Sequence, residues 1–118
     1  MTEHVVLRYR DGHTERATLE SIDATRDVIT ATREDGTQEE VPFTQLKAVF
    51  FPRMADEGEE TPAGSTLAVE FADGEVIRGS AHYNPERNGF FLYPADRSKN
   101  DRIFIVNSAI VSIEVEKL

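Results

Sequence analysis

The same short pattern, an alternating strand that ends in Asp-Gly and is followed by a second strand, occurs twice in this sequence. The first copy contains YRDGH at residues 9–13 and the second contains FADGE at residues 71–75, so the two Asp-Gly pairs lie 62 residues apart. Asp-Gly between alternating segments is a strong hairpin signal, because both residues tolerate the positive φ angles of a two-residue turn. The repeat therefore predicts a chain built from two similar halves.

Sliding the sequence along itself by 62 residues brings the apolar positions into step without a gap. Residues 1–51 and 67–118 are therefore the two predicted repeats. Residues 52–66, PRMADEGEETPAGST, are rich in proline, glycine and acidic residues, which is typical of a linker. The matched apolar positions are Val5 and Leu67, Leu7 and Val69, Tyr9 and Phe71, Val28–Ile29 and Phe90–Phe91, Val41 and Ile103, and Ala48–Val49 and Ile110–Val111.

Each repeat contains five short segments with the alternation of β-strands, and no window of a dozen residues has helical periodicity. The sequence thus predicts an all-β protein made of two tandem, five-stranded SH3-like or Sm-like small barrels. Gly79, within a strand, favours the sharp bend that such a barrel needs. The predicted strands are 4–10, 13–22, 27–33, 38–43 and 46–51, with a 3₁₀ turn at Thr44–Gln45, and then 67–72, 75–83, 89–94, 101–106 and 109–115.

A barrel of about 50 residues barely buries enough surface to be stable by itself, so we expect the two repeats to pack as a pseudo-dimer. The segment LKAVFF at residues 46–51 supports this expectation. Phe50 and Phe51 point to opposite faces of their strand, so one fills its own repeat and the other needs a cover from the second repeat. One sheet that continues from the first repeat into the second would supply that cover.

Composition and motifs argue against most kinds of chemistry. The chain has no cysteine and a formal net charge of −9, which excludes thiolate sites and disfavours binding to nucleic-acid phosphates. His4, His13 and His82 have no carboxylate or cysteine at metal-ligand spacing, and no serine motif of a hydrolytic triad is present. We therefore expect no enzymatic activity, no cofactor and no bound metal. Without a signal-peptide pattern or a membrane-length apolar run, the expected location is the cytoplasm.

The stretch at residues 83–102, YNPERNGFFLYPADRSKNDR, is the strongest candidate binding surface. It has more basic than acidic residues in a chain that is otherwise acidic, whereas the first repeat has only the turn residues ATREDGTQ at the matching place. Tyrosine and arginine contribute strongly to interfaces, and loops on a rigid scaffold are their usual location. The predicted partner-binding residues are Tyr83, Asn84, Arg87, Tyr93, Arg97, Lys99, Asn100 and Arg102.

LKAVFF at residues 46–51 and DGEVIRGSAHYNPERNGFFLYPADRSKNDRIFIVNSAI at residues 73–110 resemble an uncharacterised bacterial family. The resemblance covers most of the chain and is weaker in the first repeat. Members occur alone or beside PilZ and other signalling domains. This implies a non-enzymatic adaptor or regulatory module in bacterial cytoplasmic signalling, in a complex that controls motility or polarity. The cyclic-dinucleotide pattern of PilZ domains is not present in this sequence.

The barrel prediction leaves a second function open, a Sm-like module that binds nucleic acid or a nucleotide. Arg97, Lys99 and Arg102 are able to contact phosphates, and a tyrosine is able to stack on a base. However, Sm-like RNA-binding proteins have an Arg-Gly turn before the last strand, and the corresponding turns here are PFTQLK and VNSAIV. The sequence therefore favours a protein partner. It leaves open whether the edge strands 4–10 or 109–115 pair with a second copy to form a homodimer.

Overall fold

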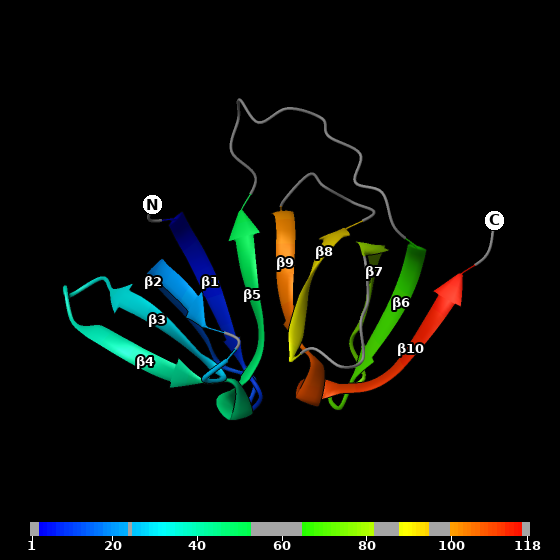
Figure 1. The fold of residues 1–118 in the computed structure, drawn as a ribbon, viewed down its shortest axis with the longest axis horizontal. Helices are drawn as coiled ribbons and strands as arrows, with labels where there is room; N and C mark the ends of the chain where they lie inside the picture. Colours follow the sequence, from blue (N-terminus) through cyan, green and yellow to red (C-terminus); the bar gives the residue numbers. More distant parts are fainter. Residues whose placement is uncertain (1–2, 24, 53–64, 82–87, 95–99, 117–118) are drawn as a thin grey trace.

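The computed structural model describes residues 3–23, 25–52, 65–81, 88–94 and 100–116 (Figure 1). The predicted all-β class, five strands in each half and a single 3₁₀ turn before each last strand are confirmed. The elements of the first half are β1 (Glu3–Tyr9), β2 (Thr14–Asp23), β3 (Val28–Arg33), β4 (Gln38–Pro42), η1 (Phe43–Gln45) and β5 (Leu46–Pro52). Those of the second half are β6 (Ser65–Phe71), β7 (Val76–Ala81), β8 (Gly89–Pro94), β9 (Asn100–Val106), η2 (Asn107–Ala109) and β10 (Ile110–Glu116).

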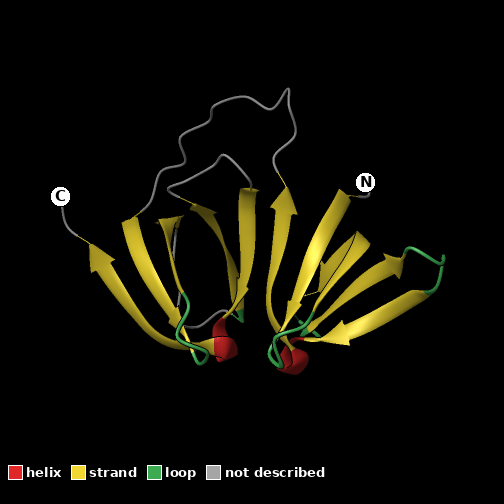
Figure 2. Ribbon diagram, turned by 180° about the vertical axis from the view of Figure 1, so that it is seen from behind, coloured by secondary structure: helices red, strands yellow, loops and turns green. Residues whose placement is uncertain are grey.

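All ten strands form one antiparallel sheet in the order β10-β6-β7-β8-β9-β5-β1-β2-β3-β4. The two halves have the same strand order. In each half the fifth strand comes first and is followed by the first, second, third and fourth strands. Figure 2 shows two strongly curved halves, yet the sheet does not close, so the predicted pair of closed small barrels is not confirmed. The open sheet therefore ends in two edge strands, β4 and β10.

The two halves are joined through β5 and β9, which lie side by side at the centre of the molecule (Figure 1). Val49 lies opposite Phe104, and Phe50 lies opposite Ile103. The fifth strand of the first repeat thus pairs with the fourth strand of the second. The expectation that one sheet continues from the first repeat into the second is confirmed.

The two repeats have their cores on opposite faces of this sheet. Directly opposed residues of antiparallel strands share a face, so Leu7 with Val49 marks one face and Phe50 with Ile103 marks the other. Since β5 and β9 contribute to both faces, the residues of β5 from Leu46 to Phe51 are all buried. The first core includes Val5, Leu7, Leu19, Ile29, Val41, Val49 and Phe51, and the second includes Leu67, Val69, Ala81, Phe90, Leu92, Ile103 and Ile105.

Phe50 and Phe51 are each covered by an arginine. The Arg8 guanidinium carbon lies 4.4 Å from the centroid of the Phe50 ring, and that of Arg102 lies 4.2 Å from the centroid of the Phe51 ring. At such distances a cation is attracted to the face of an aromatic ring. Phe50 faces the second core, so it is the phenylalanine that the second repeat covers, and Phe51 also contacts the second repeat through Arg102.

The three Asp-Gly hairpins use a different turn from the predicted one. Only the glycine has a positive φ angle, 100° at Gly12, 89° at Gly36 and 90° at Gly74, and its N–H donates to the carbonyl three residues back. The aspartate instead accepts the N–H two residues further on, as Asp11 Oδ1 does from His13 at 2.9 Å. A type I turn followed by a left-handed glycine therefore replaces the two-residue turn, because the aspartate does not adopt a positive φ angle.

The strand register corrects the predicted match between the repeats. Leu46 lies opposite Tyr9 and Ile110 lies opposite Phe71, so the last strands match at a shift of 64 residues, not 62. Two additional residues leave the alternation of a strand unchanged, so the sequence pattern did not reveal the longer shift of the last strands. The earlier pairs from Val28 onward are therefore wrong: Ile29 matches Phe90, Val41 matches Ile105, and Ala48, Val49, Phe50 and Phe51 match Ser112, Ile113, Glu114 and Val115.

Gly79 lies where two strands approach closely. A Cβ atom at this position would lie 2.3 Å from the carbonyl oxygen of Tyr93 on β8, so no other residue fits without a shift of the backbone. The matching residue of the first repeat, Ala17, is nearly as small. The predicted linker is shorter at both ends, because Pro52 ends β5 and Ser65 begins β6, and residues 53–64 lie outside the described residues.

Candidate functional site

The outer strand β10 exposes apolar side chains along a sheet edge. Val111 is 62% exposed and Val115 is 58% exposed. Val111 corresponds to Lys47, the residue at the bulge of β5, and Val115 corresponds to Phe51. Lys47 is only 6% exposed and Phe51 only 2% exposed. The same strand of the repeat is therefore covered in the first half and uncovered in the second, because only β5 has a neighbour on its outer side.

The two faces of β10 differ in chemistry. Ile113 and Val115 lie opposite Val69 and Leu67 and thus face the second core. Ser112 and Glu114 lie on the other face, where the Ser112 hydroxyl donates to Glu70 Oε1 at 3.2 Å. Glu70 and Glu114 are both exposed. The edge therefore presents an apolar row on one face and carboxylates on the other.

The opposite edge, β4, is short and carries charged residues. Glu39 and Glu40 are held by arginines of the same repeat: Arg33 contacts Glu39, and Arg26 Nη1 lies 3.0 Å from Glu40 Oε2. Charged side chains on a short edge strand discourage pairing with another strand. Of the two edges, β10 is thus the one that is suited to an additional strand.

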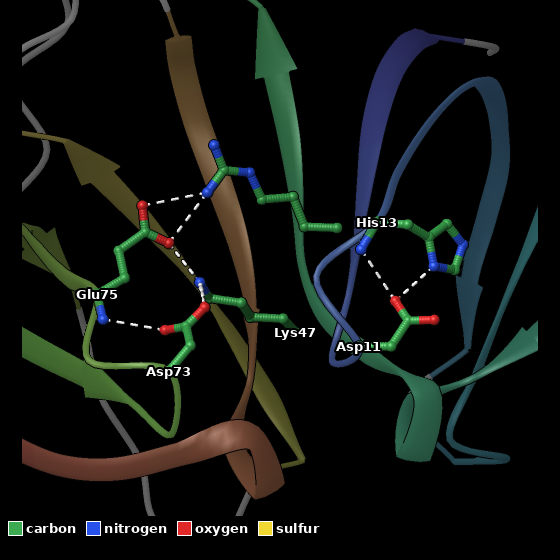
Figure 3. A network of polar contacts seen from close by, with 6 residues as sticks. Asp11, His13, Lys47, Asp73 and Glu75 are labelled. Atoms are coloured by element: carbon green, nitrogen blue, oxygen red, sulfur yellow. Dashed lines mark hydrogen bonds and ion pairs between the residues drawn. The ribbon is translucent and has the colours of Figure 1, made fainter.

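A cluster of four charged residues connects the repeats next to the β5–β9 junction (Figure 3). Lys47 Nζ lies 2.7 Å from Asp73 Oδ2 and also contacts Glu75, both in the β6–β7 hairpin. Arg8 Nη1 donates to the two carboxylate oxygens of Glu75 at 3.0 and 3.1 Å. The Lys47 ammonium lies 4.8 Å from the centroid of the Phe71 ring. The first repeat thus supplies both cations and the second repeat both carboxylates.

The cations of this cluster lower the pKa of both carboxyl groups. The hydrogen bond from Lys47 is the main reason that the pKa of Asp73 lies below its ordinary value of 3.8. Burial raises the pKa of Glu75, but the contacts from Lys47 and Arg8 outweigh burial, and the pKa is lowered from 4.5. Both carboxylates are therefore ionised at neutral pH, and Lys47 remains fully paired.

At the matching place in the first repeat, Tyr9, Asp11 and His13 contact one another instead of the other repeat. The His13 ring stacks on the Tyr9 ring with centroids 4.1 Å apart, and its Nδ1 contacts Asp11. Beside them lies an open cavity of about 400 Å³, which Glu15 and Glu39 also line. The Tyr9 hydroxyl is buried without a hydrogen-bond partner among the described residues. Burial, followed by the charges of Glu15 and Glu39, raises the pKa of Tyr9 above 10.0, so the hydroxyl stays protonated.

The structure places three of the predicted partner-binding residues. Tyr93 is partly buried on β8 opposite Ser80, and Asn100 begins β9 opposite Pro52. Arg102 covers Phe51, and its Nη2 donates to Glu3 Oε1 at 2.7 Å, so it contributes to the contact between the repeats. The remaining predicted residues lie outside the described residues: Tyr83, Asn84, Arg87, Arg97 and Lys99.

The described residues contain no group of three or more side chains that is suited to hold a metal ion. No helix in the described part of the chain is long and apolar enough to cross a membrane. The features with the clearest chemical character are thus the β10 edge and the charged junction. The junction is closed by contacts within the chain, whereas β10 has no outer neighbour among the described strands.

Comparison with known proteins gives one match. A family model with the description "Family of unknown function (DUF6982)" matches residues 1–117. No curated protein and no solved structure matches the chain. The match agrees with the predicted resemblance to an uncharacterised family, whereas the sequence motifs and the PilZ neighbourhood of that resemblance remain expectations.

Proposed function

The chain belongs to the family of unknown function DUF6982, and we propose that it is a non-enzymatic module that binds another protein through the edge strand β10. The observation that carries this proposal is the contrast between the two last strands. β5 is buried over its apolar length, whereas Val111 and Val115 of β10 are more than half exposed. An edge strand with free backbone groups and apolar side chains is a ready site for strand addition.

The wider context is also proposed. The resemblance noted above supports a regulatory or adaptor role in bacterial cytoplasmic signalling, in a complex that controls motility or polarity. The proposal keeps Arg87 and Arg97, which lie outside the described residues, as a second contact region predicted from the sequence. Arg97→Glu is the cleaner test of this region, because Arg102 is engaged with Glu3 and Phe51.

Affinity capture from a lysate of the source organism tests the proposal. The tagged chain is compared with the double variant Val111→Asp/Val115→Asp, with and without nuclease. Both valines are exposed, so the variant should fold normally, which circular dichroism checks. Val76→Asp, at a position that is 46% exposed on β7, is the matched control.

We expect a nuclease-resistant protein partner that the wild type and Val76→Asp retain and the double variant loses. A partner that all three chains bind equally well would contradict binding through β10. Recovery that disappears with nuclease would support the Sm-like, nucleic-acid-binding alternative instead, despite the net charge of −9.

A further inference from the structure

The junction between β5 and β9 shows how the last strand of a repeat is paired. Phe104 lies opposite Val49, Ile103 opposite Phe50 and Arg102 opposite Phe51. β10 is the last strand of the second repeat, and it forms an edge of the described sheet. The same geometry, transferred to β10, therefore predicts which residues of an added strand would face each β10 residue.

β10 has a charged residue at one position where β5 has an apolar one. Ile113 and Val115 take the places of Val49 and Phe51, whereas Glu114 takes the place of the buried Phe50. An added strand would thus have two residues opposite apolar side chains and, between them, one residue opposite a carboxylate. Glu70, opposite Ser112 on β6, lies on the same face and adds to the negative charge of this face.

The other edge of this chain does not fit β10. If a second copy placed its β4 where β9 lies at the junction, Glu40 would lie opposite Ile113 and Glu39 opposite Glu114. Like charges that directly oppose each other destabilise a strand pair. Two copies with a charge of −9 each also repel one another before contact. Head-to-tail assembly of identical chains is therefore disfavoured.

We propose that β10 binds an extended segment of another protein that carries a lysine or arginine opposite Glu114, between two apolar residues opposite Ile113 and Val115. This inference rests on the proposed function and states the chemistry of its partner. Glu114 has two effects: it attracts a basic strand, and it repels the β4 edge of a second copy.

Two peptides test the charge preference. Both have the sequence of residues 100–106, the strand that pairs with β5, with Arg102→Val so that an apolar residue lies opposite Val115. They differ at one position, which is Ile103→Lys in one peptide and Ile103→Glu in the other. Each labelled peptide is titrated with the full chain and followed by fluorescence anisotropy. From the energies of cross-strand charge pairs, the lysine peptide should bind roughly threefold to tenfold more tightly than the glutamate peptide. Equal affinities, or no binding of either peptide, would overturn the proposal.

Glu114→Lys should reverse the preference between the peptides. The matched control is Glu34→Lys, which changes the net charge equally at an exposed position between β3 and β4. This control should keep the preference of the wild type, narrowed slightly because the chain becomes less negative and long-range attraction then favours the lysine peptide less. An equal response of the two variants would show that only the net charge matters and would contradict a role for Glu114.

The second effect of Glu114 has its own measurement. In Glu114→Lys the new ammonium lies opposite Glu39 of a second copy, so the variant should self-associate. The wild type and Glu34→Lys should remain monomers in size-exclusion chromatography with light scattering over a range of concentrations. A wild type that already assembles through β10, or a Glu114→Lys chain that stays monomeric at every concentration, argues against the proposal.

The two proposals fail in distinguishable ways. If a captured protein partner needs Val111 and Val115 but binds Glu114→Lys as well as the wild type, the interaction function stands and the charge preference is wrong. If no partner depends on the two valines and neither peptide binds, both are wrong.

Discussion

At the scale of single residues, Lys47 defines how the two repeats fit together. It lies at a β-bulge in an otherwise apolar strand, and its ammonium reaches the β6–β7 hairpin of the other repeat. Its side chain is only 8% exposed, whereas those of Asp73 and Glu75 are 53% and 36% exposed. The cation is thus the deeply placed member of the cluster, and solvent reaches the carboxylates.

Lys47→Met should therefore weaken the fold and change its response to acid. The lost contacts should cost about 1–2 kcal/mol in the free energy of unfolding at pH 7, since two partly exposed carboxylates are left to water. In the wild type the lowered pKa values of Asp73 and Glu75 stabilise the fold above their ordinary values of 3.8 and 4.5, and this stability is lost as the pH falls through the folded-state values.

Urea unfolding between pH 7 and pH 2.5 measures this effect. Lys47→Met should lose less stability on acidification than the wild type does. Arg26→Met, which removes an exposed ion pair with Glu40, is the control and should change both quantities little. A Lys47→Met chain with the acid response of the wild type would exclude the cluster as its source.

The sequence showed which residues are charged but not how they are paired. Arg102 was predicted for its charge in a basic stretch, yet it covers Phe51, because the register brings β9 beside β5. The ion pairs of Lys47 were not predicted. A lysine within LKAVFF was the only signal, and its direction depends on a bulge that strand alternation does not reveal.

At the scale of elements, β5 was the strand that the sequence described best. LKAVFF has no polar face, so it indicated burial on both sides, and the structure confirms this. The edges were predicted less well: strand 109–115 is the edge strand β10, but strand 4–10, also expected as an edge, is β1 and lies between β5 and β2. Closure into barrels was not predictable, because alternation gives the faces of a strand but not the neighbour at each edge.

Phe50→Asp should destabilise both repeats together. Phe50 is 8% exposed and lies opposite Ile103, so loss of its buried ring should cost about 4 kcal/mol even though Arg8 is near enough to pair with the new carboxylate. Hydrogen exchange of β2 and of β7 should accelerate to the same extent, because β5 belongs to both cores. Val76→Asp, at an exposed position, should leave both rates nearly unchanged. Faster exchange in β2 alone would show that the repeats unfold independently.

At the scale of the whole molecule, the two cores share their central strands, so neither half is complete alone. Residues 1–52 and 65–118, prepared separately, should each lack stable structure, and an equimolar mixture should recover the β-sheet spectrum of the full chain. Circular dichroism and amide NMR spectra measure this. A half that folds by itself with dispersed amide signals would show that the β5–β9 junction is not required for the fold.

The position of β5 also has a consequence for synthesis of the chain. The first repeat leaves the ribosome before β9 exists, so during that interval β5 is an edge strand and the second-core face of Phe50 is uncovered. A nascent chain at this stage presents the kind of apolar edge that remains at β10 in the described sheet. The first repeat is therefore most exposed to aggregation, and most in need of a chaperone, until β9 has emerged from the ribosome.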